Sequence, residues 1–176
     1  MTLPWQDIGY LLNGTPRQQA AYHVLQGLQI FEILQDFTPV LAGTIPLGIE
    51  IPSSDLDILC EAHDADAFEY RVTTAFSGRT GFQIKSEMVD GLPTTIVNFE
   101  ADRFPIEIFA QPPPVIQQNA YRHMVVEARL LAIGGPNAAN EIRKLKQKGL
   151  KTEPAFAEYF RLSGDAYATL LALADL

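Results

Sequence analysis

Three consecutive prolines at positions 112–114 divide the chain into two parts with different local patterns. Proline cannot donate a hydrogen bond to a β-ladder, so a sheet must end at this point. After the prolines, helical spacing and glycine breaks predict helices up to residue 174. Before them, apolar or alternating runs predict strands at 38–44, 55–60, 82–89, 94–99 and 104–110, and helices at 15–35 and 64–76. This layout predicts an α+β fold: a mixed β-sheet with an N-terminal helix and a C-terminal helical layer.

The length and composition fit one packed domain. The chain has 176 residues, of which 47% are hydrophobic and 19% are charged. These values are those of a globular protein with a real core, and no internal repeat or long linker interrupts the sequence. We therefore expect a single domain over residues 1–176, with its core at 38–110 and a helical C-terminal subdomain at 115–176.

The charge distribution narrows the possible partners. The formal net charge is −8, and the first 70 residues hold a single base, Arg17. Gripping a nucleic-acid backbone needs a basic face, so this balance disfavours stable nucleic-acid binding but does not exclude a small phosphorylated substrate. Cys60 is the sole cysteine, so the chain forms no internal disulfide, which fits a reducing cytoplasm. No apolar run approaches the roughly 20 residues that span a bilayer. We expect a soluble, cytoplasmic protein with no membrane partner.

Three carboxylates form the strongest candidate site. Asp55 and Asp57 flank Leu56 at the start of a predicted strand, so their side chains project from the same face, about 7 Å apart. A third acid, Glu107, stands alone in an otherwise apolar strand. If the two strands are neighbours, the three acids converge, and such a cluster is costly without a cation. Carboxylate oxygens are ligands that Mg²⁺ prefers, and Mg²⁺ commonly bridges carboxylates and substrate phosphates.

A glycine and a hydroxyl precede this pair. Gly43 ends the preceding predicted strand, where its missing side chain would let a phosphate approach the backbone. Thr44 follows it with a hydroxyl that can donate to a phosphate oxygen.

The combination resembles the nucleotidyltransferase superfamily typified by DNA polymerase beta, in which a strand, Gly-Ser, a loop, Asp-x-Asp and a later acidic strand follow one another. The resemblance implies that Asp55, Asp57 and Glu107 are catalytic and bind metal, Mg²⁺ or Mn²⁺ in its place. Gly43 and Thr44 match the Gly-Ser position. The implied activity is Mg²⁺-dependent transfer of a nucleotidyl group from a nucleoside triphosphate to an acceptor that the sequence does not identify.

Two further stretches support the resemblance. Ser54 begins a Ser-Asp-x-Asp run that is typical of small bacterial members, and it joins the predicted nucleotide-binding residues. Residues 43–49 and 149–156 are also similar to a bacterial family of this superfamily that is catalogued as a domain of unknown function.

The sequence departs from the superfamily pattern in the loop after Thr44, because residues 45–54 contain no Lys or Arg to hold a triphosphate. Arg122, with His123 beside it, follows the Glu107 strand and is predicted to reach the nucleotide. The bases between 143 and 148 lie on several faces of a predicted helix and are interpreted as a solvated surface.

The missing base also favours an alternative. The chain could be a binding module that keeps the nucleotidyltransferase fold without turnover, either an antitoxin-like partner or a nucleotide sensor. A protein partner or a homodimer would fit this alternative. An apolar patch at Leu170, Leu171 and Leu173 could serve such a contact, although packing in the core is the expected use of these leucines.

Overall fold

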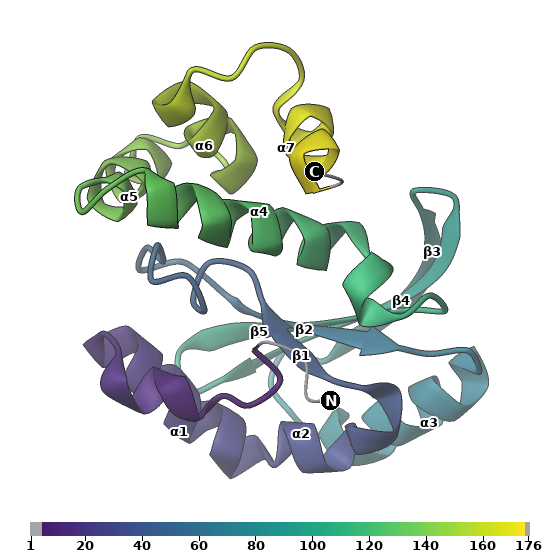
Figure 1. Ribbon diagram of the computed structural model, residues 1–176. Helices are drawn as coiled ribbons and strands as arrows, with labels where there is room; N and C mark the ends of the chain where they lie inside the picture. The colour runs from purple at the N-terminus through teal and green to yellow at the C-terminus, as the bar shows by residue number, and fades with distance from the viewer. Residues whose placement is uncertain (1–4, 175–176) are drawn as a thin grey trace.

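The computed structural model describes residues 5–174 and confirms the α+β class (Figure 1). Its five strands lie in the order β1-β2-β5-β4-β3, in which β2 and β5 are parallel and the other neighbours are antiparallel. The strands are β1 (Val40–Ala42), β2 (Leu56–Glu61), β3 (Gln83–Val89), β4 (Leu92–Ala101) and β5 (Phe104–Gln111). The parallel pair places the predicted acidic strands beside each other in the centre of the sheet.

The N-terminal half of the chain covers one face of the sheet (Figure 1). The main core lies on this face, where Leu25, Phe68 and the strand residues Ile58 and Ile108 are fully buried. The covering elements are the 3₁₀ helix η1 (Gly9–Asn13), α1 (Pro16–Leu28), α2 (Ile30–Ile33), the 3₁₀ helix η2 (Gln35–Phe37) and α3 (Ala65–Phe76).

The single long helix predicted at 15–35 is wrong in one respect, because it breaks at Gln29. This residue adopts a left-handed conformation with φ of 52° and separates α1 from α2. Ile30 and Leu34 do not share the helical face of Leu25 and Leu28, yet all four are buried. The break turns Ile30 and Leu34 into the core, which offsets the cost of the left-handed residue.

The C-terminal helices cover the other face (Figure 1). Tyr121 and Met124 of helix α4 (Asn119–Ile133) pack on Val40 and Leu59 of the sheet. A separate core joins the helices to one another and includes Ile49 from the loop between β1 and β2. The elements are the 3₁₀ helix η3 (Val115–Gln117), α4 (Asn119–Ile133), α5 (Ala138–Gln147), α6 (Thr152–Phe160) and α7 (Ala166–Ala174).

None of the helices in residues 5–174 is both long enough and apolar enough to cross a membrane.

Candidate functional site

The three predicted carboxylates line one cavity of about 350 Å³ between the sheet and the C-terminal helices. Asp57 of β2 pairs in register with Glu107 of β5, so the two residues lie on neighbouring strands about 5 Å apart on one face. Asp55 precedes β2 by one residue and projects to the same side. Parallel pairing of β2 and β5 thus brings together two acids that are 50 positions apart in the chain.

Gly43 packs directly against the carboxylate of Asp57. Its backbone is left-handed, with φ of 77°, and a Cβ atom at this position would lie 2.1 Å from Asp57 Oδ2. A side chain cannot occupy this space, so only glycine lets the end of β1 approach the carboxylate so closely. The same close approach leaves the backbone at Gly43 open to the cavity, which Gly43 lines.

Thr44 and Ser54 close the loop between β1 and β2 at the edge of the cavity. The Thr44 hydroxyl donates to Ser54 Oγ at 3.2 Å, and Ser54 Oγ accepts the Ile51 N–H at 3.0 Å. Both residues line the cavity. The loop therefore places the two hydroxyls together, although the residues are ten positions apart in the chain.

Helix α1 holds this loop from one side. Its N-terminus has a complete capping box, which fixes the first turn. From that turn, Arg17 donates to the Ser54 carbonyl at 2.8 Å, and Gln18 donates to the Ile45 carbonyl at 2.7 Å. The Arg17 guanidinium also lies 4.3 Å from the centre of the Phe104 ring, a cation–π contact.

Helix α5 holds the loop from the other side and supplies the base that the loop lacks. Lys146 lines the cavity, is only 7% exposed, and donates to the Ile49 carbonyl at 3.3 Å. Arg143 donates to the Gly48 carbonyl. The interpretation of these bases as a solvated surface is therefore wrong for Lys146.

A sequence signal for Lys146 does exist. Ala138, Ile142 and Lys146 recur every four residues, which places them on one helical face, and all three are buried. Ala138 and Ile142 mark the face of α5 that packs inward, so Lys146 lies on the same buried face.

Burial, followed by repulsion from neighbouring acids, raises the pKa values of Asp57 and Glu107. Burial raises the pKa of Asp57 well above its ordinary value, the charges of Asp55 and Glu107 raise it further, and Lys146 opposes them. Burial also raises the pKa of Glu107, with Asp55 adding to the effect and Lys85 opposing it. The acids of this cavity thus exceed the protein cations that could neutralise them.

A fourth acid, Glu127 of α4, also lines the cavity and was not predicted from the sequence. Burial, followed by the charge of Glu153, raises the pKa of Glu127 to about 8, and Lys146 opposes the shift. In turn, burial lowers the pKa of Lys146, and Glu127 is the strongest of the acids whose negative charges raise this pKa. Lys146 is therefore a partly desolvated cation that faces acids from several elements.

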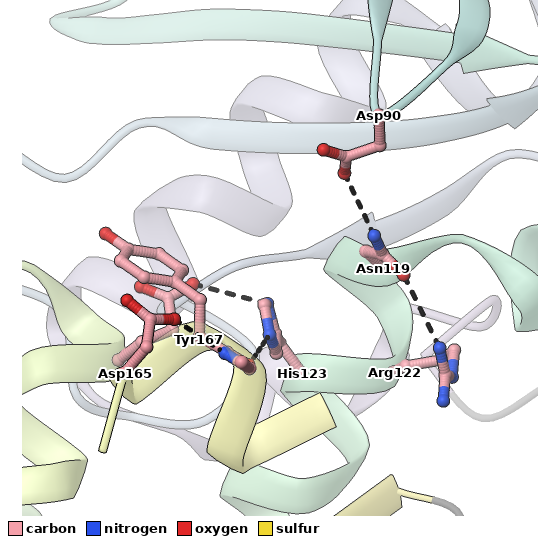
Figure 2. Close-up of polar contacts among 8 residues, drawn as sticks. Asp90, Asn119, Arg122, His123, Asp165 and Tyr167 are labelled. Carbon is pink, nitrogen blue, oxygen red and sulfur yellow. Dashed lines mark hydrogen bonds and ion pairs between the residues drawn. The ribbon is translucent and has the colours of Figure 1, made fainter. Parts of the chain in front are cut away.

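The structure separates the two residues predicted after the Glu107 strand. Arg122 is not among the described residues that line the cavity, and its Nη1 lies 3.5 Å from Asn119 Oδ1 (Figure 2). Asn119 in turn donates to Asp90 at 2.9 Å, which ties α4 to the β3–β4 turn. Among the described residues, Lys146 rather than Arg122 is the base on the cavity wall.

His123, by contrast, lines the cavity. Its Nε2 lies 3.1 Å from the Tyr167 carbonyl oxygen (Figure 2). Its Nδ1 lies 3.5 Å from Glu153 Oε1. The ring therefore bridges α4, α6 and α7 at the cavity wall.

Within residues 5–174, no three His, Cys, Asp or Glu side chains form a cluster that could hold a metal ion as they stand. The chemistry of the donors nevertheless fits a hard divalent cation. Asp55 and Asp57 offer only carboxylate oxygens, and the repulsion around Asp57 is the kind that a cation relieves.

The fold is that of the nucleotidyltransferases. Three solved structures illustrate the similarity: Cid1, described with RNA terminal uridylyl transferase activity (TM-score 0.55, 11% identity), the GLD-2/RNP-8 complex (0.54, 16%) and the polymerase core of TRAMP, an RNA surveillance complex (0.51, 10%). They cover 79%, 86% and 89% of this chain. The chain spans about half the length of each, 45%, 57% and 48% respectively.

The sequence itself identifies the family. A family model matches residues 23–173, so the chain belongs to the family described as domain of unknown function DUF4269. No curated protein matches the sequence.

Proposed function

We propose that the protein is a Mg²⁺-dependent nucleotidyltransferase that moves a nucleotidyl group from a nucleoside triphosphate to a hydroxyl-bearing acceptor. The observation that carries the proposal is the in-register pairing of Asp57 with Glu107 in a cavity that also holds Asp55 and Lys146. Asp55 and Asp57 would hold the metal. When bound, Mg²⁺ would supply positive charge for the triphosphate and the leaving pyrophosphate.

The cavity offers separate places for the parts of a triphosphate. The open backbone at Gly43 and the hydroxyl of Thr44 lie on one side of Asp57, and Lys146 reaches the cavity from α5. Lys146 would bind phosphate oxygens as a point charge, in the role that a loop base has in related enzymes. Because α1 and α5 both fix the loop, these groups stand in place before substrate arrives.

The acceptor would enter from the side of Glu107. Asn98 pairs in register with Glu107, and Gln83 pairs with Asn98, so two amide side chains continue the row toward the open edge of the sheet. They line a separate hollow of about 440 Å³. We infer that Glu107 accepts the proton of an acceptor hydroxyl, whose oxygen then bonds to the α-phosphorus as the bond to pyrophosphate breaks.

The test is calorimetric titration with Mg²⁺ and non-hydrolysable nucleoside triphosphates. Asp57→Asn should weaken binding at least about tenfold, because the substitution removes the charge that would hold the metal. Asp66→Asn is the matched control, since Asp66 is exposed on α3, which covers the face of the sheet opposite the cavity. Equal affinity in the wild type and in Asp57→Asn would refute the proposal.

The binding-module alternative rests on the loop, whose residues 45–54 carry no base and whose carbonyls are already held by protein donors. This alternative also predicts that Asp57→Asn weakens Mg²⁺–nucleotide binding. It differs from the proposed enzyme in predicting that the bound nucleotide is not turned over. Mg²⁺-dependent binding that never yields pyrophosphate from any of the four common triphosphates, with a range of hydroxyl acceptors, would favour it.

A further inference from the structure

Strand β3 forms an open edge of the sheet. It pairs with β4 on one side, and no described strand pairs with its other side. Five of its seven residues are exposed, and Met88 is 65% exposed. An edge of this kind presents unpaired N–H and C=O groups to any strand of suitable sequence.

The sequence of β3 is complementary to itself in one antiparallel register. A two-fold axis through Ser86 would set Lys85 of one copy opposite Glu87 of the other, and Ile84 opposite Met88. The charged pair and the apolar pair each occur twice in the dimer, as symmetry requires. Opposite charges directly across a pair of strands attract each other, and apolar side chains directly across it pack.

Other registers lose this match. In a symmetric antiparallel pair one residue must face its own copy across the two-fold axis, because the backbone groups of two directly opposite residues both point toward the partner strand or both point away from it. An axis through Lys85 or Glu87 sets like charges opposite each other, and an axis through Ile84 or Met88 leaves neither charge opposite its complement. The charges on β3 therefore select one register and discourage others.

The two faces of β3 would contribute differently. Lys85 and Glu87 lie on the face of the sheet that carries Glu107, and they already form a 2.9 Å ion pair along the strand. A second copy would extend this pair to an alternating square of four charges. On the opposite face, Met88 borders an apolar cavity of about 360 Å³, and the second copy's Ile84 would lie beside it.

We propose that two copies of the chain associate through β3, antiparallel about Ser86, and join their five-stranded sheets into one continuous sheet. This inference uses no residue assigned to metal or phosphate binding, but Ile84 and Lys85 also line the hollow proposed for the acceptor. Its test therefore reads the mass of the protein and not its activity.

The primary test measures the mass of the purified chain by sedimentation velocity over a wide concentration range. The wild type should show a concentration-dependent species of twice the monomer mass of 19.5 kDa. Lys85→Glu and Glu87→Lys should each weaken the dimer about tenfold or more, since each places like charges across the axis. Lys144→Glu is the matched control, because Lys144 is an exposed base of another ion pair on α5.

Two rescue experiments distinguish a specific register from a general charge effect. A mixture of Lys85→Glu with Glu87→Lys should form a heterodimer, and the double variant that exchanges both charges should dimerise like the wild type. Circular dichroism should show that every variant folds, since both side chains are exposed. A wild type that stays monomeric, single variants that dimerise normally, or failure of both rescues would each overturn the proposal.

Discussion

Gly43→Ala provides the sharpest test of how the site is built. The alanine Cβ would meet Asp57 Oδ2 at 2.1 Å, more than 1 Å closer than the 3.4 Å at which ordinary contact begins. The backbone conformation alone, with φ of 77°, costs a non-glycine residue about 1–2 kcal/mol. Turning the Asp57 side chain out of its rotamer costs about 1 kcal/mol more. We expect a total loss of about 2–3 kcal/mol in the free energy of unfolding.

Gly91→Ala separates the two contributions. Gly91 has almost the same conformation, with φ of 78°, but nothing lies within 4 Å of the Cβ position. This variant should lose only about 1–2 kcal/mol, the backbone cost. Urea denaturation of both variants measures the difference, and calorimetry should show weakened Mg²⁺–nucleotide binding for Gly43→Ala alone.

A double-mutant cycle gives the decisive result. In an Asp57→Ala background, the nearest remaining atom to the new methyl group at position 43 is the residue 57 Cβ at 3.6 Å, an ordinary contact. Gly43→Ala should then cost no more than Gly91→Ala, so the two substitutions should be coupled by about 1 kcal/mol. Strictly additive effects of Gly43→Ala and Asp57→Ala would refute the argument that the glycine exists to admit the carboxylate.

Two further predictions concern α4 and α5. Burial raises the pKa of Glu127 from 4.5 to about 8, so between these pH values the folded state retains a proton that the unfolded state releases. The folded state is therefore most stable, with respect to this group, below about pH 4, and it loses this stability as the pH rises toward 8. Glu127→Gln should remove this dependence, which is worth at most about 5 kcal/mol, and unequal denaturation midpoints at pH 5 and pH 8 should become more similar. Lys146→Gln should weaken triphosphate binding at least about tenfold, whereas Lys144→Gln, an exposed neighbour on α5, should leave it unchanged; equal losses would contradict the role given to Lys146.

Much of the fold follows from local patterns. The alternation of apolar residues in β2 and β5 and the helical spacing after Pro114 predicted the observed elements to within a few residues. The capping residues Thr15 and Asp64 mark the starts of α1 and α3, where their side chains accept backbone N–H groups. The break at Gln29 could not be predicted in this way, because it depends on where the sheet needs apolar side chains.

The sequence by itself determined which residues could form a site: a glycine before a hydroxyl, two acids with strand spacing and one isolated acid. Only the tertiary structure decided that Asp57 and Glu107 are lateral neighbours and that Lys146 reaches them while Arg122 does not line the cavity. The physical reason is one of range. Strand and helix patterns arise from neighbours in the chain, whereas the Lys146–Ile49 contact joins residues 97 positions apart and depends on how α5 packs over the loop.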